Sequence, residues 1–217
     1  MHRILRRASF SLRETLVSLL ACTAFAAPPT APTVVAFGDS ITEGYGVERN
    51  DAYPAQLERA LAARGLRVKM INAGVSADTT GNALDRLSAV IAAKPRLVLV
   101  EFGGNDGLRG LPLDTTRRNL SEIVQRLQKS GARVALIGMT LPGNYGAVFV
   151  ARFEKLYQEV AAQYKITLIP VRRAAVLGTG KGLMQPDGIH PTAAGYAQFV
   201  RYLLPLVEKE VRALRSP

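Results

Sequence analysis

The sequence predicts an α/β fold in which helices cover both faces of a parallel β-sheet. Short apolar runs alternate along the chain with longer segments whose apolar residues recur at three- and four-residue spacing, as in helices that pack one face. No repeat, low-complexity tract or internal linker interrupts this series after residue 32. Such alternation is typical of a single domain built on a parallel sheet.

Strands and helices are expected to follow one another in turn, beginning with a strand. The expected strands are residues 33–37, 67–72, 97–102, 134–139 and 167–170. The expected helices are residues 53–64, 81–93, 115–129, 148–164 and 192–214. Pro205 lies inside the last of these helices and is expected to bend or interrupt it, because proline lacks the backbone N–H.

The first 26 residues have the features of a secretory signal peptide. Four arginines form a basic start, residues 15–26 are mainly apolar, and Ala24-Phe25-Ala26 matches the small-x-small cleavage pattern. The apolar stretch is too short to span a bilayer comfortably. We therefore expect export and cleavage after Ala26, which makes the protein periplasmic or secreted. A membrane anchor and a lipid-modified Cys22 are the alternatives.

The remaining residues, 27–217, are 191 in number, long enough for one well-buried domain and short for two. Loss of four arginines and one glutamate with residues 1–26 lowers the formal net charge from +11 to +8. Lysine and arginine are dispersed, aromatic residues make up only 6%, and no nucleic-acid motif is present, which disfavours a nucleic-acid binder. The basic surface instead favours weak association with a membrane surface or anionic lipid.

Neither a metal nor a cofactor is expected. Cys22 is the only cysteine, so a chain cleaved after Ala26 has no thiol, no disulfide and no cysteine-based metal site. Asp78 and Asp106 lack metal-ligand spacing with other acids or histidines. The phosphate-binding pattern Gly-x-x-x-x-Gly-Lys-Ser/Thr is missing from the sequence.

Polar and glycine-rich clusters follow the first three expected strands. Gly38-Asp39-Ser40 follows the first strand, residues 72–80 follow the second, and Gly103-Gly104-Asn105-Asp106 follows the third. In an open parallel sheet, functional groups collect outside the carboxyl ends of the strands. We therefore expect these three loops to face one crevice.

A serine nucleophile with an imidazole base is the chemistry that these loops favour. His190 is the only histidine after residue 26, and Ser40 comes directly after a buried strand. Asp187, three residues before His190, can reach one ring nitrogen while the other points toward Ser40. Pro186 and Pro191 bracket this turn and restrict its backbone. The alternative is a histidine that only caps a loop.

Acyl transfer also needs hydrogen-bond donors for the oxyanion. The Ser40 backbone N–H at a helix start is one candidate, and the Asn105 side-chain amide is another; the alternative for Asn105 is a simple turn residue. Asp39, next to the nucleophile, is interpreted as a turn-stabilising residue that bonds backbone N–H groups of the helix start. Asp78 and Asp106 receive the same interpretation.

Several motifs in order resemble those of the SGNH, or GDSL, hydrolase family. The matching blocks are Gly38-Asp39-Ser40, Gly104-Asn105-Asp106 and Asp187-Gly188-Ile189-His190-Pro191. Residues 100–110 and 141–146 are more similar still to the branch of periplasmic acyl-CoA thioesterase I, lysophospholipase and arylesterase. The resemblance covers essentially all of residues 33–207.

The resemblance implies a three-layer α/β/α, flavodoxin-like fold with about five parallel strands. It also implies Ser40 as nucleophile, His190 as general base and acid, Asp187 as orienting carboxylate, and Asn105 in the oxyanion hole with two backbone amides. One position departs from the family pattern. Ala77 stands where the family has a glycine that donates its N–H, with Gly74 as the fallback. If φ at this position is positive, Ala77 is strained by roughly 1 kcal/mol or more.

The sequence therefore predicts an exported serine esterase or thioesterase that hydrolyses aryl esters, acyl thioesters or lysophospholipids. A carbohydrate or small-ester deacetylase of the same fold, a non-catalytic flavodoxin-like binding protein and a membrane-surface module are the alternatives. Residues 141–150 are expected to line the acyl pocket, with a plain surface loop as the alternative. The candidate substrate-binding residues are Leu141, Pro142, Asn144 and Tyr145. Residues 176–184 are interpreted as a loop, or a flap, beside the catalytic turn.

Overall fold

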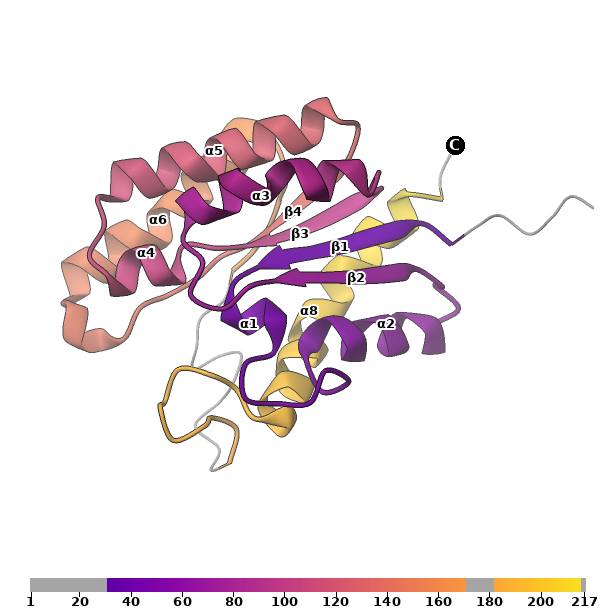
Figure 1. The fold of residues 1–217 in the computed structure, drawn as a ribbon, viewed down its shortest axis with the longest axis horizontal. Helices are drawn as coiled ribbons and strands as arrows, with labels where there is room; N and C mark the ends of the chain where they lie inside the picture. Colours follow the sequence, from indigo (N-terminus) through magenta and orange to yellow (C-terminus); the bar gives the residue numbers. More distant parts are fainter. Residues whose placement is uncertain (1–30, 171–181, 216–217) are drawn as a thin grey trace, which may run out of the picture. The chain divides into compact units, whose positions relative to one another are not determined.

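The computed structural model describes residues 31–170 and 182–215 (Figure 1). The predicted signal peptide, its cleavage site and Cys22 lie outside the described residues, as do residues 176–181 of the expected loop. Within the described ranges, none of the helices combines the length and the apolar character needed to cross a membrane.

A five-stranded parallel sheet forms the centre of the fold, with strand order β2-β1-β3-β4-β5. Each observed strand begins and ends within two residues of its expected position. The strands are β1 (Thr33–Gly38), β2 (Lys69–Gly74), β3 (Leu97–Glu101), β4 (Arg133–Ile137) and β5 (Thr167–Ile169). This order is the flavodoxin-like arrangement, so the expected fold class is confirmed.

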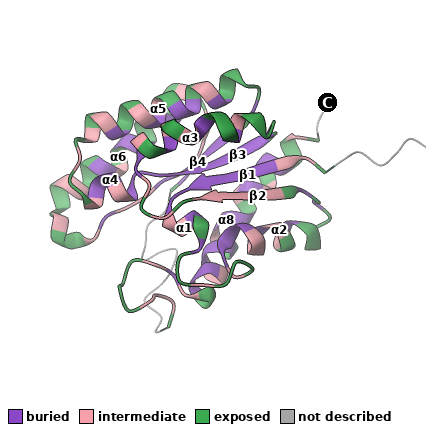
Figure 2. Cartoon of the chain, viewed as in Figure 1, coloured by how far each residue is buried: buried purple, intermediate pink, exposed green. Residues whose placement is uncertain are grey.

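Helices lie on both faces of the sheet because side chains along each strand alternate between two apolar clusters (Figures 1 and 2). On β1, Val34 and Ala36 belong to one cluster, and Val35 and Phe37 belong to the other. The helices that complete the first cluster are α2 (Tyr53–Ala63) and α8 (Ala193–Ala213). The helices that complete the second cluster are α3 (Thr80–Ala92), α5 (Leu113–Lys129) and α6 (Ala147–Tyr164).

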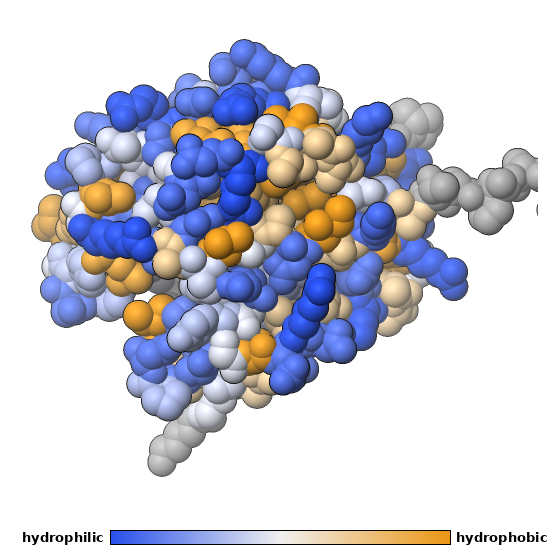
Figure 3. Space-filling view, viewed as in Figure 1, coloured by the Kyte–Doolittle hydropathy of each residue, from blue (hydrophilic) through white to orange (hydrophobic). Residues whose placement is uncertain are grey.

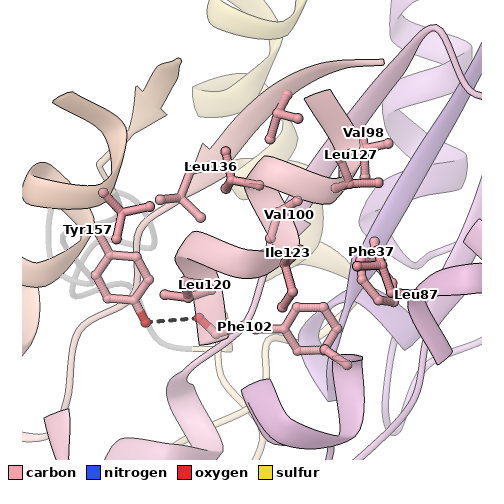
Figure 4. Close-up of a cluster of buried hydrophobic side chains, with 14 of the residues drawn as sticks. Phe37, Leu87, Val98, Val100, Phe102, Leu120, Ile123, Leu127, Leu136 and Tyr157 are labelled. Carbon is pink, nitrogen blue, oxygen red and sulfur yellow. Dashed lines mark hydrogen bonds between the residues drawn. The ribbon is translucent and has the colours of Figure 1, made fainter. Parts of the chain in front are cut away.

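The central strands are nearly continuous apolar runs because both of their faces are covered. All five residues of β3 are buried, whereas β2, at the edge of the sheet, is mostly half-buried. Figure 4 shows the larger cluster, in which Val98, Val100 and Phe102 lie among side chains of α5. On the face shown in Figure 3, hydrophilic side chains predominate and hydrophobic ones appear in small groups between them.

Of the two outcomes expected for Pro205, a bend or an interruption of the last helix, the interruption is wrong. Helix α8 continues from Ala193 to Ala213 with Pro205 inside it. Pro205 is exposed, so its ring faces solvent and the carbonyl group that loses its helical partner can be hydrated there. Nine residues of α8 are buried, and their packing outweighs the lost hydrogen bond.

The crevice predicted at the strand ends lies where the connections from β1 and β3 diverge. After β1 the chain enters the short helix α1 (Ser40–Glu43), and after β3 it enters α4 (Gly104–Leu108). The turn after β3 needs Gly103, because its φ is +108° and a Cβ there would collide with the Tyr157 hydroxyl. That hydroxyl donates to the Phe102 carbonyl at 2.9 Å, the dashed line in Figure 4.

Candidate active site

Ser40, His190 and Asp187 form one hydrogen-bonded chain. The His190 Nε2 atom lies 2.9 Å from the Ser40 Oγ atom, although the two residues are 150 positions apart. The His190 Nδ1 atom lies 2.7 Å from Asp187 Oδ2. The imidazole therefore has one nitrogen on the carboxylate and the other on the hydroxyl, which is the arrangement that activates a serine nucleophile.

The carboxylate of Asp187 holds the turn as well as the imidazole. Its Oδ1 atom accepts the backbone N–H groups of Ile189 at 2.8 Å and His190 at 3.0 Å. Hydrogen bonds from the His190 ring and from these N–H groups lower the pKa of Asp187 to about 2. The side chain, which is 37% exposed, therefore stays ionised at neutral pH.

Gln185 connects this turn to the nucleophile. Its backbone N–H donates to the His190 carbonyl at 2.8 Å, and its side-chain amide donates to the Tyr45 carbonyl at 2.8 Å. Tyr45 in turn donates its N–H to the Ser40 carbonyl at 3.0 Å. A short path of hydrogen bonds thus fixes the distance between the acid–base turn and the serine.

Asp39 caps the helix that begins with Ser40. Its Oδ1 atom accepts the Ile41 N–H at 3.0 Å, and its Oδ2 atom accepts the Asn105 side-chain amide at 3.2 Å. Asp39 is only 2% exposed, and burial raises its pKa to about 6. These contacts are those of the turn-stabilising residue that the sequence analysis expects.

Glu101 lies fully buried beneath the nucleophile turn, and the sequence analysis did not single it out. It accepts the Thr42 hydroxyl at 2.8 Å and the Asp39 N–H at 3.4 Å. Burial, followed by the nearby carboxyl of Asp39, raises the pKa of Glu101 well above its usual range. Gly38 makes room for this group, because a Cβ there would collide with Thr42 and Glu101. The sequence feature that could have identified Glu101 is a single acidic residue at the end of an otherwise apolar strand.

The two backbone candidates for the oxyanion hole differ in their placement. Ala77 lines the catalytic cavity, and its φ of +66° is in the left-handed region that L-residues rarely adopt. Gly74, the fallback, does not line that cavity, and its N–H donates to the Asn72 side chain at 2.9 Å. A Cβ at Gly74 would collide with the backbone of Glu43, so packing accounts for this glycine.

Three donors hold the strained turn around Ala77. Arg109 donates to the Ala77 carbonyl at 2.8 Å, Asn105 donates to the Asp78 carbonyl at 3.0 Å, and Arg86 Nε lies 2.6 Å from the Asp78 carboxylate. Arg86 also donates to the carbonyls of Gly38 and Ala73, in the last residues of β1 and β2, and lies over the ring of Phe37 at 4.6 Å. The sequence analysis did not identify either arginine, because their role depends on contacts between distant segments.

The Asn105 amide lies between the nucleophile turn and the Ala77 turn. Its nitrogen donates to both Asp39 and Asp78, as described above. Within the described part of the chain, the backbone N–H groups of Ser40 and Ala77 have no hydrogen-bond acceptor. These two N–H groups and the Asn105 amide are therefore the donors that an oxyanion at Ser40 would meet.

An apolar cavity of about 290 Å³ opens beside Ser40. Leu141 and Pro142 line it, as expected, whereas Asn144 and Tyr145 are not among its lining residues. Asn144 is exposed, and the Tyr145 hydroxyl donates to the Leu108 carbonyl at 2.9 Å, which ties the loop to α4. Lining residues that the sequence analysis did not identify include Ile41, Tyr45, Leu108, Met139, Ile189 and Phe199.

Across residues 31–170 and 182–215, no group of three or more His, Cys, Asp or Glu side chains is arranged to hold a metal ion.

Comparison with known families identifies the chain. The model of the GDSL-like Lipase/Acylhydrolase family matches residues 36–198. The chain belongs to this family. It is therefore a hydrolase of acyl bonds, and the resemblance inferred from its motifs is confirmed.

Two members with named activities are similar to this chain in sequence. It is 38% identical over 179 residues to "Esterase TesA" of Pseudomonas aeruginosa, which covers 82% of this chain and 89% of the relative. It is 36% identical over 162 residues to "Thioesterase 1/protease 1/lysophospholipase L1" of Escherichia coli K12, covering 74% and 76% of the two chains. The crystal structure of TesA matches with a TM-score of 0.78 at 38% identity, covering 82% of this chain and 99% of that one.

Proposed function

We propose that this GDSL hydrolase is an exported serine esterase or thioesterase that acts through an acyl-enzyme on Ser40. The observation that carries the proposal is the 2.9 Å contact between Ser40 Oγ and His190 Nε2, with Asp187 on the other ring nitrogen. A non-catalytic binding protein of this fold has no need for that alignment. The proposed enzyme domain comprises residues 27–217.

The reaction begins when His190 accepts the proton of the Ser40 hydroxyl as Ser40 Oγ attacks the acyl carbonyl. The new Oγ–C bond places negative charge on the carbonyl oxygen. His190 then gives its proton to the leaving oxygen or sulfur as the C–O or C–S bond breaks. In deacylation, His190 accepts a proton from a water molecule whose oxygen attacks the acyl carbonyl. The Oγ–C bond then breaks, His190 returns the proton to Ser40 Oγ, and the acid is released. Asp187 stabilises the imidazolium at each stage.

Oxyanion stabilisation falls to the N–H groups of Ser40 and Ala77 and to the amide of Asn105. Both N–H groups of the Asn105 side-chain amide donate hydrogen bonds in this structure, one to Asp39 and one to the Asp78 carbonyl. The hydrogen bond to Asp39, at 3.2 Å, is the longer of the two. To donate to an oxyanion, the Asn105 N–H that faces Asp39 must therefore share or break its hydrogen bond to that carboxylate. Because the oxyanion carries more charge than a ground-state carbonyl, this exchange favours the transition state.

The acyl group is assigned to the apolar end of the cavity, where Leu108, Met139 and Leu141 lie. These apolar side chains favour a hydrocarbon chain over a polar sugar, which favours acyl esters, thioesters and lysophospholipids above carbohydrate acetates. Esterase, thioesterase and lysophospholipase are also the activities named for the relatives. The substrate is thus a small-molecule ester or thioester, and no cofactor takes part in the proposed steps.

Replacing Ser40 with alanine tests the mechanism. With p-nitrophenyl esters and acyl-CoA thioesters of increasing chain length, kcat should fall by roughly 10⁵ to 10⁶, because the nucleophile is lost. The melting temperature should stay close to that of the wild type, since Ser40 is not buried in the core. Retention of full activity by Ser40→Ala would refute the mechanism. Measuring the intact mass of the exported protein would test cleavage after Ala26 against lipid attachment at Cys22.

A further inference from the structure

Tyr45 is an aromatic residue whose exposure is unusual within this fold. Its side chain is 52% exposed, and it is the one exposed aromatic residue among those that the structure describes. It also lines the catalytic cavity. An isolated exposed apolar side chain needs no explanation, but one in the wall of a catalytic cavity is a candidate for substrate contact.

The backbone of Tyr45 is fixed without help from its ring. Its N–H donates to the Ser40 carbonyl at 3.0 Å, and its carbonyl accepts the Gln185 amide at 2.8 Å. Gly44, with a φ of +92°, ends α1 and turns the chain so that both bonds form. The ring is therefore held at a set place beside the nucleophile while about half of its surface remains open.

The Tyr45 ring lies against the catalytic imidazole. The ring centroids of Tyr45 and His190 are 4.6 Å apart, and the ring planes are inclined by 42°. The two nitrogens of His190 are already engaged by Asp187 and Ser40, so Tyr45 contacts the ring without competing for either nitrogen.

The chemistry of the first step decides which part of a substrate meets this ring. His190 Nε2 must hand its proton to the leaving oxygen or sulfur, so the leaving group has to lie next to His190. Among the residues that line the cavity, Tyr45 lies against the His190 ring, and Ile189, which is 40% exposed, precedes His190 in the chain. The apolar walls at Leu108 and Leu141 remain available for the acyl chain.

We infer that Tyr45 and Ile189 form a leaving-group subsite that selects a flat aromatic alcohol over an aliphatic one. The inference rests on the proposed serine-esterase function. Tyr45 offers an exposed aromatic face and Ile189 an exposed branched aliphatic side chain, and offset or edge-to-face aromatic pairs are favoured over aromatic–aliphatic pairs. The subsite acts only while the leaving group is attached, that is, during formation of the acyl-enzyme.

This timing separates a leaving-group subsite from a residue that merely positions His190. The imidazole serves both acylation and deacylation, so a positioning residue affects both steps. The leaving group has already departed before deacylation, so a subsite residue affects acylation alone. The ratio kcat/KM reports acylation, and the rate after a burst of the first product reports deacylation.

The experiment compares phenyl butyrate with trifluoroethyl butyrate, which have the same acyl group. Tyr45→Leu should lower kcat/KM for the phenyl ester roughly three- to tenfold more than for the trifluoroethyl ester. Comparing each variant with the wild type on the same ester cancels the difference in leaving-group acidity. Deacylation, followed after the burst with p-nitrophenyl butyrate, should be unchanged. Tyr45→Phe, which keeps the ring, should behave like the wild type.

Equal losses on both esters, no loss on either, or slower deacylation in Tyr45→Leu would overturn the inference. The Ser40→Ala variant keeps this test separate from that of the proposed function. If wild-type protein hydrolyses neither ester, or if Ser40→Ala remains active, the serine-esterase mechanism itself fails. If Ser40→Ala is inactive and Tyr45→Leu does not discriminate, only the leaving-group subsite fails.

Discussion

Two aspartates flank the catalytic centre, and their environments shift their pKa values in opposite directions. Asp39 is 2% exposed, and loss of hydration raises its pKa to about 6. Asp187 has a side chain that is 37% exposed and accepts three hydrogen bonds, which lower its pKa to about 2. Hydrogen bonds to the charged form outweigh burial at Asp187, and burial outweighs them at Asp39. Asp187 therefore keeps its charge well below neutral pH, whereas Asp39 becomes protonated as the pH falls through about 6.

The two halves of the site also differ in how far along the chain their contacts reach. Asp187 and His190 are three positions apart, so their turn forms from local residues. The bonds Thr42–Glu101 and Asp39–Asn105 join residues 59 and 66 positions apart. They depend on the pairing of β1 with β3, whose register sets Gly38 beside Glu101. The acid–base half is local and hydrated, and the nucleophile half exists only once the sheet is assembled.

Among the substitutions that test this difference between the two halves of the site, removing the charge of Asp187 should lower kcat the most. In Asp187→Asn an amide can donate to the imidazole and favour the wrong tautomer, so kcat should fall by about 10⁴. The melting temperature should change little, because the side chain is partly exposed. Steady-state kinetics and thermal unfolding check both expectations. A loss of less than tenfold would mean that His190 does not depend on Asp187.

Asn105→Ala should have the next largest effect. Loss of one oxyanion donor typically lowers kcat by about 10² to 10³ with little change in KM. Asn50→Ala, an exposed asparagine outside the cavity, is the matched control and should resemble the wild type. An Asn105→Ala enzyme with unchanged kcat, or with a change confined to KM, would remove Asn105 from the oxyanion hole.

The raised pKa of Asp39 predicts a loss of stability as pH rises. Between the ordinary pKa of 3.8 and the folded-state value of about 6, the folded protein holds a proton that the unfolded chain has lost. Stability is therefore highest below pH 4 as far as this group is concerned, and it declines until about pH 6, by on the order of 3 kcal/mol. Glu101, whose pKa is also raised by burial, adds a decline of the same sign above its ordinary pKa of 4.5.

Asp39→Asn should reduce this pH dependence, because asparagine keeps the helix cap and does not titrate. Denaturant unfolding at pH 4.5 and 7.5 measures the difference in the free energy of unfolding between the two pH values. Asp85→Asn, at an exposed position on α3, is the control and should leave that difference as it is. Identical pH dependence in the wild type and Asp39→Asn would show that Asp39 titrates normally in the folded protein.

Ala77→Gly should have the smallest effect. Glycine relieves the cost of a φ of +66°, roughly 1 kcal/mol, but loses part of that gain to the greater freedom of the unfolded chain. The free energy of unfolding should therefore rise by less than about 1 kcal/mol. The backbone N–H is kept, so kcat should stay within about twofold of the wild type. A large drop in kcat would instead show that the methyl group of Ala77 contacts the substrate.

The sequence by itself determined the fold class, the strand positions to within two residues, and the set of candidate catalytic side chains. Apolar periodicity and strand-end motifs depend on residues close together in the chain, and the carboxyl ends of parallel strands meet at one edge whatever the details. Ser40, Asn105, Asp187 and His190 could be named for that reason.

Only the tertiary structure decided the left-handed conformation of Ala77, the continuity of α8 through Pro205, the buried position of Glu101 and the contact between Tyr45 and His190. Each depends on distances between groups far apart in sequence. Desolvation, backbone strain and ring contacts are set by those distances, and local pattern carries no information about them.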